Sequence, residues 1–278
     1  MRHHILLPTD FSENAWSAAL YAIRLYAKVP CTFYFSHAWT FVNTGSRTYI
    51  SPSYIDQLQN TSKEQLETLK ERAKFVSPNS EHKFESIFSE DYLTASIKTA
   101  IQDNAIDLVV MGTKGATGAK ELLLGSNSVN VIKKVKLCPV LLVPYNYEYA
   151  TTDRMAFATD FKRPYGDEIR PLLSLAKLQK SDLEILHISG PDDLTEKQQN
   201  NLNALTQHLK DQPHNIHWIP EIGTKEEIIS AFIEENNIKL ITMINYTHSF
   251  LEYVLNEPVI KKLGYHSPIP FMVIPHQS

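Results

Sequence analysis

Glycine, cysteine, long apolar runs and excess positive charge are all scarce or absent in this chain of 278 residues. The two cysteines, Cys31 and Cys138, are too far apart for a disulfide framework or a metal-binding spacing. The chain has no run of about 18 apolar residues, which a membrane-spanning helix would need. Its N-terminus lacks the apolar core of a secretory signal. A formal net charge of -4 argues against a strongly basic face for nucleic acid. We therefore expect a cytoplasmic protein without a membrane or nucleic-acid partner.

The same series of short patterns occurs twice along the chain. Thr-Asp-Phe follows an apolar run at residues 9–11 and again at residues 159–161, and His37 and His187 end apolar runs at the same offset of 150. Three later pairs recur in the same order: Asp107–Met111 with Lys239–Met243, Val131–Lys134 with Val259–Lys262, and Pro139–Pro144 with Pro270–Pro275. Such ordered matches indicate a tandem duplication with a shortened second copy. We predict domains at residues 1–147 and 152–278.

Apolar runs that alternate with apolar residues at helical spacing predict alternating strands and helices within each copy. Ser12 is a candidate N-cap, and Thr61 with Glu64 and Thr224 with Glu227 have capping-box spacing. The predicted strands Asp107–Met111 and Val140–Val143 are almost entirely apolar, which is typical of a parallel sheet covered on both faces. We predict an α/β fold of two tandem doubly wound domains, each with a five-stranded parallel sheet and helices on both faces.

Glycine is concentrated in one place, directly after the predicted strand Asp107–Met111. Four of the nine glycines fall there: Gly112, Gly115, Gly118 and Gly125. Glycine lets the backbone approach a ligand closely. Gly125 and Ser126 open a predicted helix that runs on through Val129–Lys136, where unpaired N–H groups and the helix dipole favour an anion. Ligands of open α/β sheets bind beyond the carboxyl ends of the strands, so Asp10 would lie across the same crevice.

Several familiar loop motifs are absent. No Gly-Lys-Ser/Thr triplet completes a Walker A loop. The dinucleotide fingerprint should follow the first strand, where this chain has Pro8-Thr9-Asp10-Phe11. A nucleophile elbow is missing as well.

The pattern Gly112-x2-Gly115-x9-Gly125-Ser126, together with Asp10, resembles the ATP-binding branch of the universal stress protein family. The resemblance covers nearly the whole chain and implies an adenine nucleotide alpha hydrolase-like fold that binds ATP or a related adenine nucleotide, with Mg as a candidate companion. By resemblance, Asp10 contacts the ribose, the backbone of Ala38 lies against the adenine, and the glycine loop holds the phosphates. The implied nucleotide-binding residues are Pro8, Thr9, Asp10, Ala38, Met111, Gly112, Gly115, Gly125, Ser126, Asn127 and Ser128.

The chain departs from the family pattern in both copies. Asn127 stands where the family usually has an aliphatic residue, and Ala38 is smaller than the usual valine. The second copy has no glycine in the loop directly after Met243, and its Glu252 and Glu257 would repel phosphate if they faced it. We therefore predict that nucleotide binds to the N-terminal domain only.

Three functions are compatible with these features. The first is a stress-response binding or signalling module whose second domain replaces a dimer mate as an intramolecular pseudo-dimer, with a further homodimer left open. The second is a slow ATP hydrolase or self-phosphorylating protein, and the third is a nucleotide-free scaffold. We favour the first and assign no catalytic or metal-binding residue, because Asp10 is the only obvious carboxylate near the predicted phosphate site. His37 and His187 are interpreted as strand-end residues held by local hydrogen bonds.

Overall fold

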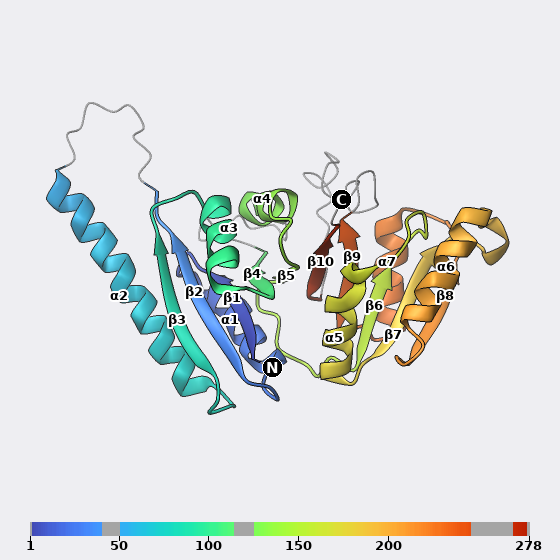
Figure 1. The fold of residues 1–278 in the computed structure, drawn as a ribbon, viewed down its shortest axis with the longest axis horizontal. Coiled ribbons are helices and arrows are strands. Elements are labelled where there is room, and N and C mark those ends of the chain that lie inside the picture. Colours follow the sequence, from blue (N-terminus) through green and yellow to red (C-terminus); the bar gives the residue numbers. More distant parts are fainter. Residues whose placement is uncertain (1, 41–50, 114–124, 246–268, 277–278) are drawn as a thin grey trace. The chain divides into compact units, whose positions relative to one another are not determined.

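The computed structural model describes residues 2–40, 51–113, 125–245 and 269–276. The chain forms two compact units that divide between Val140 and Leu141. The first unit comprises the blue to green elements of Figure 1, and the second comprises the yellow to red elements. The α/β fold predicted from the sequence is confirmed in both, and each unit is described by itself.

The first unit contains a parallel sheet with the strand order β3-β2-β1-β4. Its strands are β1 (His3–Pro8), β2 (Cys31–Ala38), β3 (Lys83–Ser89) and β4 (Leu108–Gly112). The chain first moves from β1 to β2 and β3, and then returns to place β4 on the other side of β1. The carboxyl ends of β1 and β4 therefore flank a topological switch point, where open α/β sheets bind their ligands.

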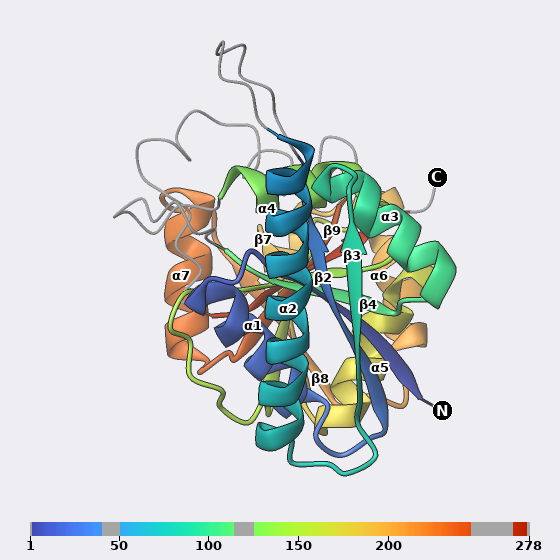
Figure 2. The ribbon, with the colours of Figure 1, turned by 90° about the vertical axis from the view of Figure 1, so that its left-hand side faces the viewer.

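Helices cover both faces of this sheet (Figure 2). They are α1 (Glu13–Leu25), α2 (Pro52–Val76), α3 (Leu93–Asn104) and α4 (Ser126–Lys134). The predicted N-cap of the first helix is confirmed, because the Ser12 side chain accepts a hydrogen bond from the Ala15 N–H at 3.2 Å. Helix α4 begins at Ser126, directly after the Gly125 N-cap, so the predicted helix start at Gly125 and Ser126 is confirmed. Helical structure therefore reaches the end of the glycine-rich stretch.

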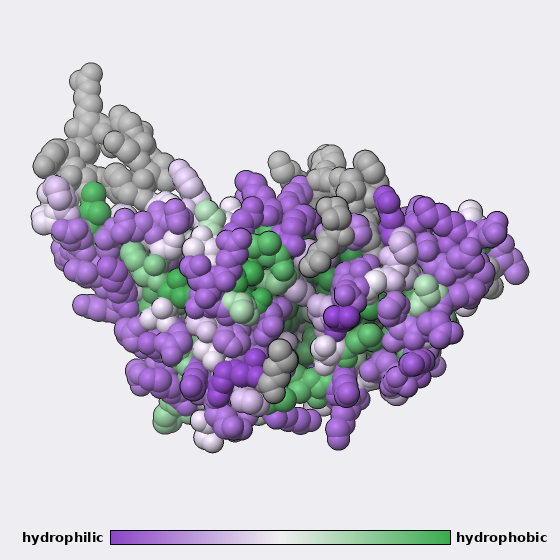
Figure 3. Space-filling view, viewed as in Figure 1, coloured by the Kyte–Doolittle hydropathy of each residue, from purple (hydrophilic) through white to green (hydrophobic). Residues whose placement is uncertain are grey.

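Helix α2 begins at Pro52, two residues before the helix that the apolar spacing predicts within Tyr54–Val76. Ser51 is its N-cap and Pro52 occupies its first turn. Thr61 lies inside the helix, where its hydroxyl donates to the Gln57 carbonyl at 3.0 Å, so the predicted capping box is wrong. Proline is tolerated in a first helical turn because that N–H has no intrahelical acceptor. Most of α2 is exposed, and the region that it occupies is largely hydrophilic in Figure 3.

The second unit contains five parallel strands in the order β10-β9-β6-β7-β8. The strands are β6 (Arg154–Ala158), β7 (Asp182–Ile188), β8 (His214–Ile219), β9 (Leu240–Asn245) and β10 (Phe271–Pro275). The helices are α5 (Arg170–Gln179), α6 (Glu196–His208) and α7 (Lys225–Glu235), with short 3-10 turns at Asp167–Ile169 and Pro191–Asp193. The Thr224–Glu227 capping box predicted for α7 is present. In both units, therefore, the first strand lies between the second and the fourth strand of its unit.

The remaining strand, β5 (Val140–Val143), begins where the two units divide. The carbonyl of Pro139, just before it, accepts a hydrogen bond from the Val109 N–H at 3.0 Å. Both cysteines are free thiols and buried in the first unit, as their apolar surroundings in the sequence suggested. Within the described residues, no helix has the length and apolar character needed to cross a bilayer. The domain limits predicted at residues 147 and 152 stay a prediction from the repeat.

Candidate functional site

The turn after β1 positions the first candidate residues. Phe11 adopts a left-handed conformation with φ 64°, which is uncommon for a residue other than glycine. Two local hydrogen bonds hold the turn: Thr9 Oγ1 accepts from the Phe11 N–H at 2.9 Å, and Asp10 Oδ1 accepts from the Ser12 N–H at 3.1 Å. Side chains of this kind stabilise turns by replacing backbone partners. The turn leaves Asp10 exposed at the strand end.

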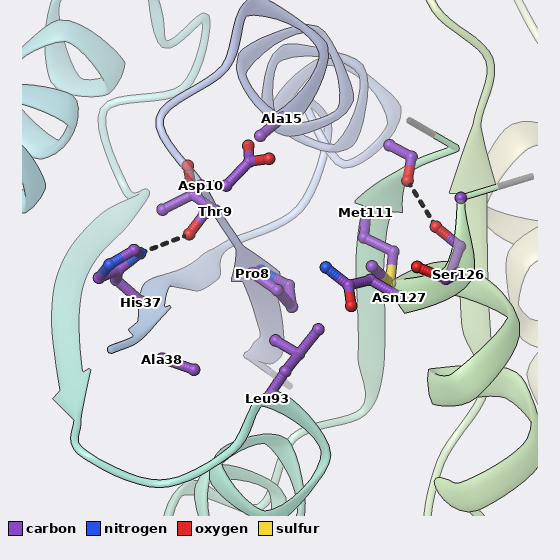
Figure 4. Close-up of a pocket in the computed structure, with 13 residues that line it drawn as sticks. Pro8, Thr9, Asp10, Ala15, His37, Ala38, Leu93, Met111, Ser126 and Asn127 are labelled. Atoms are coloured by element: carbon purple, nitrogen blue, oxygen red, sulfur yellow. Dashed lines mark hydrogen bonds between the residues drawn. The ribbon is translucent and has the colours of Figure 1, made fainter. Parts of the chain in front are cut away.

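His37 fixes the same turn from the neighbouring strand. Its Nδ1 lies 2.8 Å from the Thr9 carbonyl oxygen (Figure 4). A backbone carbonyl only accepts, so Nδ1 carries the proton in this hydrogen bond. The imidazole also lies against the Phe11 ring, with 4.5 Å between the ring centroids. His37 is therefore a positioning residue for the turn, as the sequence interpretation proposed.

The N-terminus of α4 supplies the opposite wall. Gly125 is the N-cap, and its own N–H donates to the Thr113 carbonyl at 2.6 Å. The next three N–H groups, at residues 126–128, precede the first intrahelical bond, which runs from Val129 to the Gly125 carbonyl. Among the described residues these three N–H groups have no acceptor. They lie at the positive end of the helix dipole, so this helix start favours an anionic ligand group.

Ser128 connects this helix start to β4. Its hydroxyl is buried and donates to the Gly112 carbonyl at 3.0 Å. A hydroxyl has one proton to donate, so in this structure the Ser128 side chain ties α4 to the strand. A direct contact between Ser128 and phosphate stays a prediction, for which its backbone N–H is the available donor.

Gly112 is needed because the side chain of Asn14 occupies the space above it. A Cβ atom at residue 112 would lie 2.3 Å from Asn14 Nδ2 and 2.6 Å from its Cγ. Asn14 comes from the first turn of α1 and is buried. Only glycine therefore allows α1 and the end of β4 to approach this closely.

These segments together enclose a pocket at the carboxyl ends of the strands (Figure 4). The pocket is lined by Pro8, Thr9, Asp10, Ala15, His37, Ala38, Leu93, Met111, Gly112, Gly125, Ser126, Asn127 and Ser128. All described members of the sequence-predicted nucleotide set are among them, although their part in binding stays a prediction. Gly115 lies outside the described residues, as do Lys114 and Lys120.

Three lining residues were not in the predicted set. The helical spacing of apolar residues predicts that Ala15 and Leu93 lie on the buried faces of their helices, and His37 was interpreted only as a strand-end residue. Leu93 is the first residue of α3, and it is half-buried in a position where a buried core residue was expected. The signal that could have identified it is its place just after β3, beside the ends of the strands that carry Ala38 and Pro8.

Among the described lining residues, Asp10 is the only carboxylate, and there is no lysine or arginine. No group of three or more histidine, cysteine, aspartate or glutamate side chains within the described ranges is arranged to hold a metal ion. The donors that face the pocket are therefore neutral hydroxyl, amide and backbone groups.

The second unit repeats the turn of the first. Phe161 has φ 53° and its N–H is bonded to Thr159 Oγ1, while Asp160 Oδ1 accepts from the Lys162 N–H. His187 Nδ1 lies 2.9 Å from the Thr159 carbonyl oxygen. These contacts match those of the first unit at the offset of 150. The two units therefore share the hydrogen bonds that hold the turn after their first strand.

What surrounds the turn differs between the units. Residue 165, at the same offset from Ala15, is a buried tyrosine whose hydroxyl is hydrogen-bonded to Thr159 Oγ1. Its ring also packs edge-on against Phe157, with 6.0 Å between centroids. In the first unit the corresponding Ala15 faces the pocket. In the second unit a protein side chain thus packs beside the end of the first strand, against Thr159 and Phe157.

Burial lowers the pKa of His187 below its ordinary value, and the Thr159 carbonyl only partly opposes this effect. At a pH above about 6.5, folded and unfolded chains both hold a neutral imidazole. As the pH falls through this value, the unfolded chain gains a proton that the folded unit does not, so stability is lost until the lower folded pKa is reached. We expect urea unfolding of the second unit to become easier from about pH 7 to about pH 5. The substitution His187→Asn, which keeps a donor for Thr159, should reduce this slope, and an unchanged slope would contradict the assignment.

The fold and the pocket define the class of protein: a doubly wound α/β protein with an anion-favouring pocket at its switch point. Residues 1–144 match the model of the universal stress protein family, and the chain belongs to this family. Universal stress protein YxiE of Bacillus subtilis is 26% identical over 148 residues, which cover 51% of this chain and 99% of that protein. A universal stress protein of Methanocaldococcus jannaschii is 50% identical over 42 residues, covering 15% of this chain and 25% of that protein.

The likeness also extends over both units. The crystal structure of a universal stress protein from Archaeoglobus fulgidus is similar over 99% of this chain and 97% of that chain, with a TM-score of 0.73 and 21% sequence identity. This comparison supports the fold.

Proposed function

We propose that the first unit binds an adenine nucleotide such as ATP, and that the protein acts as a binding or signalling module of the stress response. The observation that carries the proposal is the pairing of two surfaces in one pocket. Pro8, Ala38, Leu93 and Met111 form an apolar side, and the first turn of α4 presents N–H groups without an acceptor among the described residues. A nucleotide needs both, because its base is flat and largely apolar while its phosphates are anionic. Membership of the family supports the choice of adenine.

We propose further that the second unit does not bind nucleotide in this way. Tyr165 supports this proposal, because its buried side chain is bonded to Thr159 in the turn after β6, whereas residue 15, at the same offset in the first unit, is an alanine that lines the pocket. The sequence after β9 supports it as well, since Ile244–Asn256 contains no glycine that would let the backbone approach phosphate.

The proposed activity is binding, with no dedicated catalysis. A hydrolase needs a base positioned for water and a group that stabilises the transferring phosphoryl. In the described part of the pocket, Asp10 is exposed and His37 uses Nδ1 to hold the Thr9 carbonyl. We also propose a cytoplasmic protein in which the second unit acts as a built-in partner of the first. Independent tumbling of the two units in solution would contradict that partnership.

Calorimetric titration with Mg-ATP, after bound nucleotide has been stripped from the purified protein, tests the proposal. We expect one site, and affinity at least tenfold weaker in Gly125→Val, because a branched side chain at the N-cap would intrude where the backbone meets the phosphates. The control is Gly190→Ala in the second unit, where a Cβ would approach only the Asp193 carboxylate, at 3.0 Å. It should bind as the intact protein does.

The other outcomes decide between the alternatives. Two equivalent sites would show that the second unit binds as well. An absence of both heat and thermal shift would favour a nucleotide-free scaffold. Turnover of ATP well above background, abolished by Gly125→Val, would favour a hydrolase.

A further inference from the structure

Asn127 is the second residue of α4, and its side chain lines the pocket. It is exposed on the pocket side of the helix. In Figure 4 its amide extends from α4 into the pocket toward Pro8 at the end of β1. No described residue accepts or donates a hydrogen bond to this amide.

Ser126, which precedes Asn127 in α4, also lines the pocket, whereas the next polar side chains of the helix are committed elsewhere or face elsewhere. Ser128 donates its hydroxyl proton to the Gly112 carbonyl. Asn130, one turn further along α4, is exposed but does not line the pocket. The Asn127 amide is therefore a side-chain group of α4 that is both directed into the pocket and available to a ligand.

We propose that Asn127 is a specificity-determining residue whose side-chain NH2 donates a hydrogen bond to a phosphoryl oxygen of the ligand. The assignment rests on the proposed nucleotide site. The N–H groups of residues 126–128 and the helix dipole attract an anion to this place. The amide NH2 would then turn toward the anion, because its carbonyl oxygen would be repelled. Asn127 thus adds a side-chain donor to the backbone donors and favours phosphorylated over unphosphorylated nucleosides.

Two substitutions of Asn127 separate this role from the role of the backbone. Asn127→Val removes the amide and keeps the backbone N–H, and Asn127→Asp keeps the shape but replaces the donor with a carboxylate. A hydrogen bond to a charged group contributes enough for an expected loss of about 10- to 100-fold in Mg-ATP affinity in Asn127→Val. Asn127→Asp should bind more weakly still, because its carboxylate faces the phosphate.

Folding should not obscure this comparison. An acidic side chain in the first turn of a helix is favourable, so Asn127→Asp should melt no lower than the intact protein without ligand. Asn130→Asp is the matched control, since it adds the same charge to the same helix outside the pocket. It should keep Mg-ATP affinity within about twofold, because exposed charges interact weakly through water.

Each result of the titrations decides the proposal. The proposal is supported if Mg-ATP affinity falls most in Asn127→Asp, less in Asn127→Val and least in Asn130→Asp. It also requires that unphosphorylated adenosine bind equally to the intact protein and to Asn127→Val. Unchanged ATP affinity in Asn127→Val overturns it while leaving the nucleotide site in place. Binding by Asn127→Asp that equals or exceeds that of the intact protein overturns it too, because the amide would then act as an acceptor. No ATP binding by the intact protein overturns both this assignment and the proposed function.

Discussion

Gly112→Ala is expected to destabilise the first unit by about 1–3 kcal/mol and to weaken nucleotide binding at least tenfold. The added methyl group would lie 2.3 Å from Asn14 Nδ2, well inside van der Waals contact. Asn14 is buried and its side chain is short, so it has little room to move. The strain would reach the ligand site from two sides, since Asn14 belongs to the helix that follows Asp10 and the Gly112 carbonyl holds Ser128.

A double-mutant cycle tests whether the clash with Asn14 is the cause. Asn14→Ala removes the atoms that the new methyl group would meet, so Gly112→Ala should cost much less stability in the Asn14→Ala background. Gly166→Ala in the second unit is the control, because its Cβ would approach only the flexible Glu168 carboxylate, at 3.0 Å. Urea unfolding measures the stability and calorimetry the affinity. Equal costs of Gly112→Ala in both backgrounds would refute the steric explanation.

Tyr165→Ala is expected to destabilise the second unit by about 3–5 kcal/mol, the range for truncating a buried aromatic side chain. Tyr165 packs against Phe157 and its hydroxyl is bonded to Thr159, so truncation opens a cavity beside β6. Tyr165→Phe keeps the ring and loses only the hydrogen bond, which should cost about 1 kcal/mol. Tyr92→Ala in the first unit is the matched control, because Tyr92 is 73% exposed, and it should change stability by less than about 0.5 kcal/mol.

Hydrogen exchange localises the effect of these tyrosine substitutions. Faster exchange in Tyr165→Ala should be concentrated in β6 and β7 and spare β1 and β2, since amides report the stability of the unit that protects them. A cost below about 1 kcal/mol would show that Tyr165 is not packed as the structure has it. Nucleotide binding to Tyr165→Ala at a second site would show that this side chain keeps nucleotide out of the second unit.

The α/β class and the family could be predicted from the sequence alone, and its ordered patterns predicted a duplication. Ordered patterns such as Thr-Asp-Phe recur because both copies need the same turn after their first strand. Local signals were also sufficient for the helix starts at Ser12 and Thr224, whose side chains cap a backbone only three residues away. They were insufficient at Thr61, where the same spacing falls inside a helix that begins at Ser51 and Pro52. Spacing alone does not show whether the preceding residues are already helical.

The pocket's predicted residues came from a family pattern, but their arrangement came from the tertiary structure. Nothing local in the sequence places Asn14 against Gly112, Leu93 beside Ala38, or Ser128 on the Gly112 carbonyl, because each pair joins elements that are distant along the chain. The same reason applies to Tyr165. At the offset of 150 it merely replaces an alanine, and only the packing of the second unit shows that it is buried with its hydroxyl bonded to Thr159. Local sequence fixes turns and caps within a few residues, whereas which side chains share a cavity depends on how the strands order themselves and on which helices cover their ends.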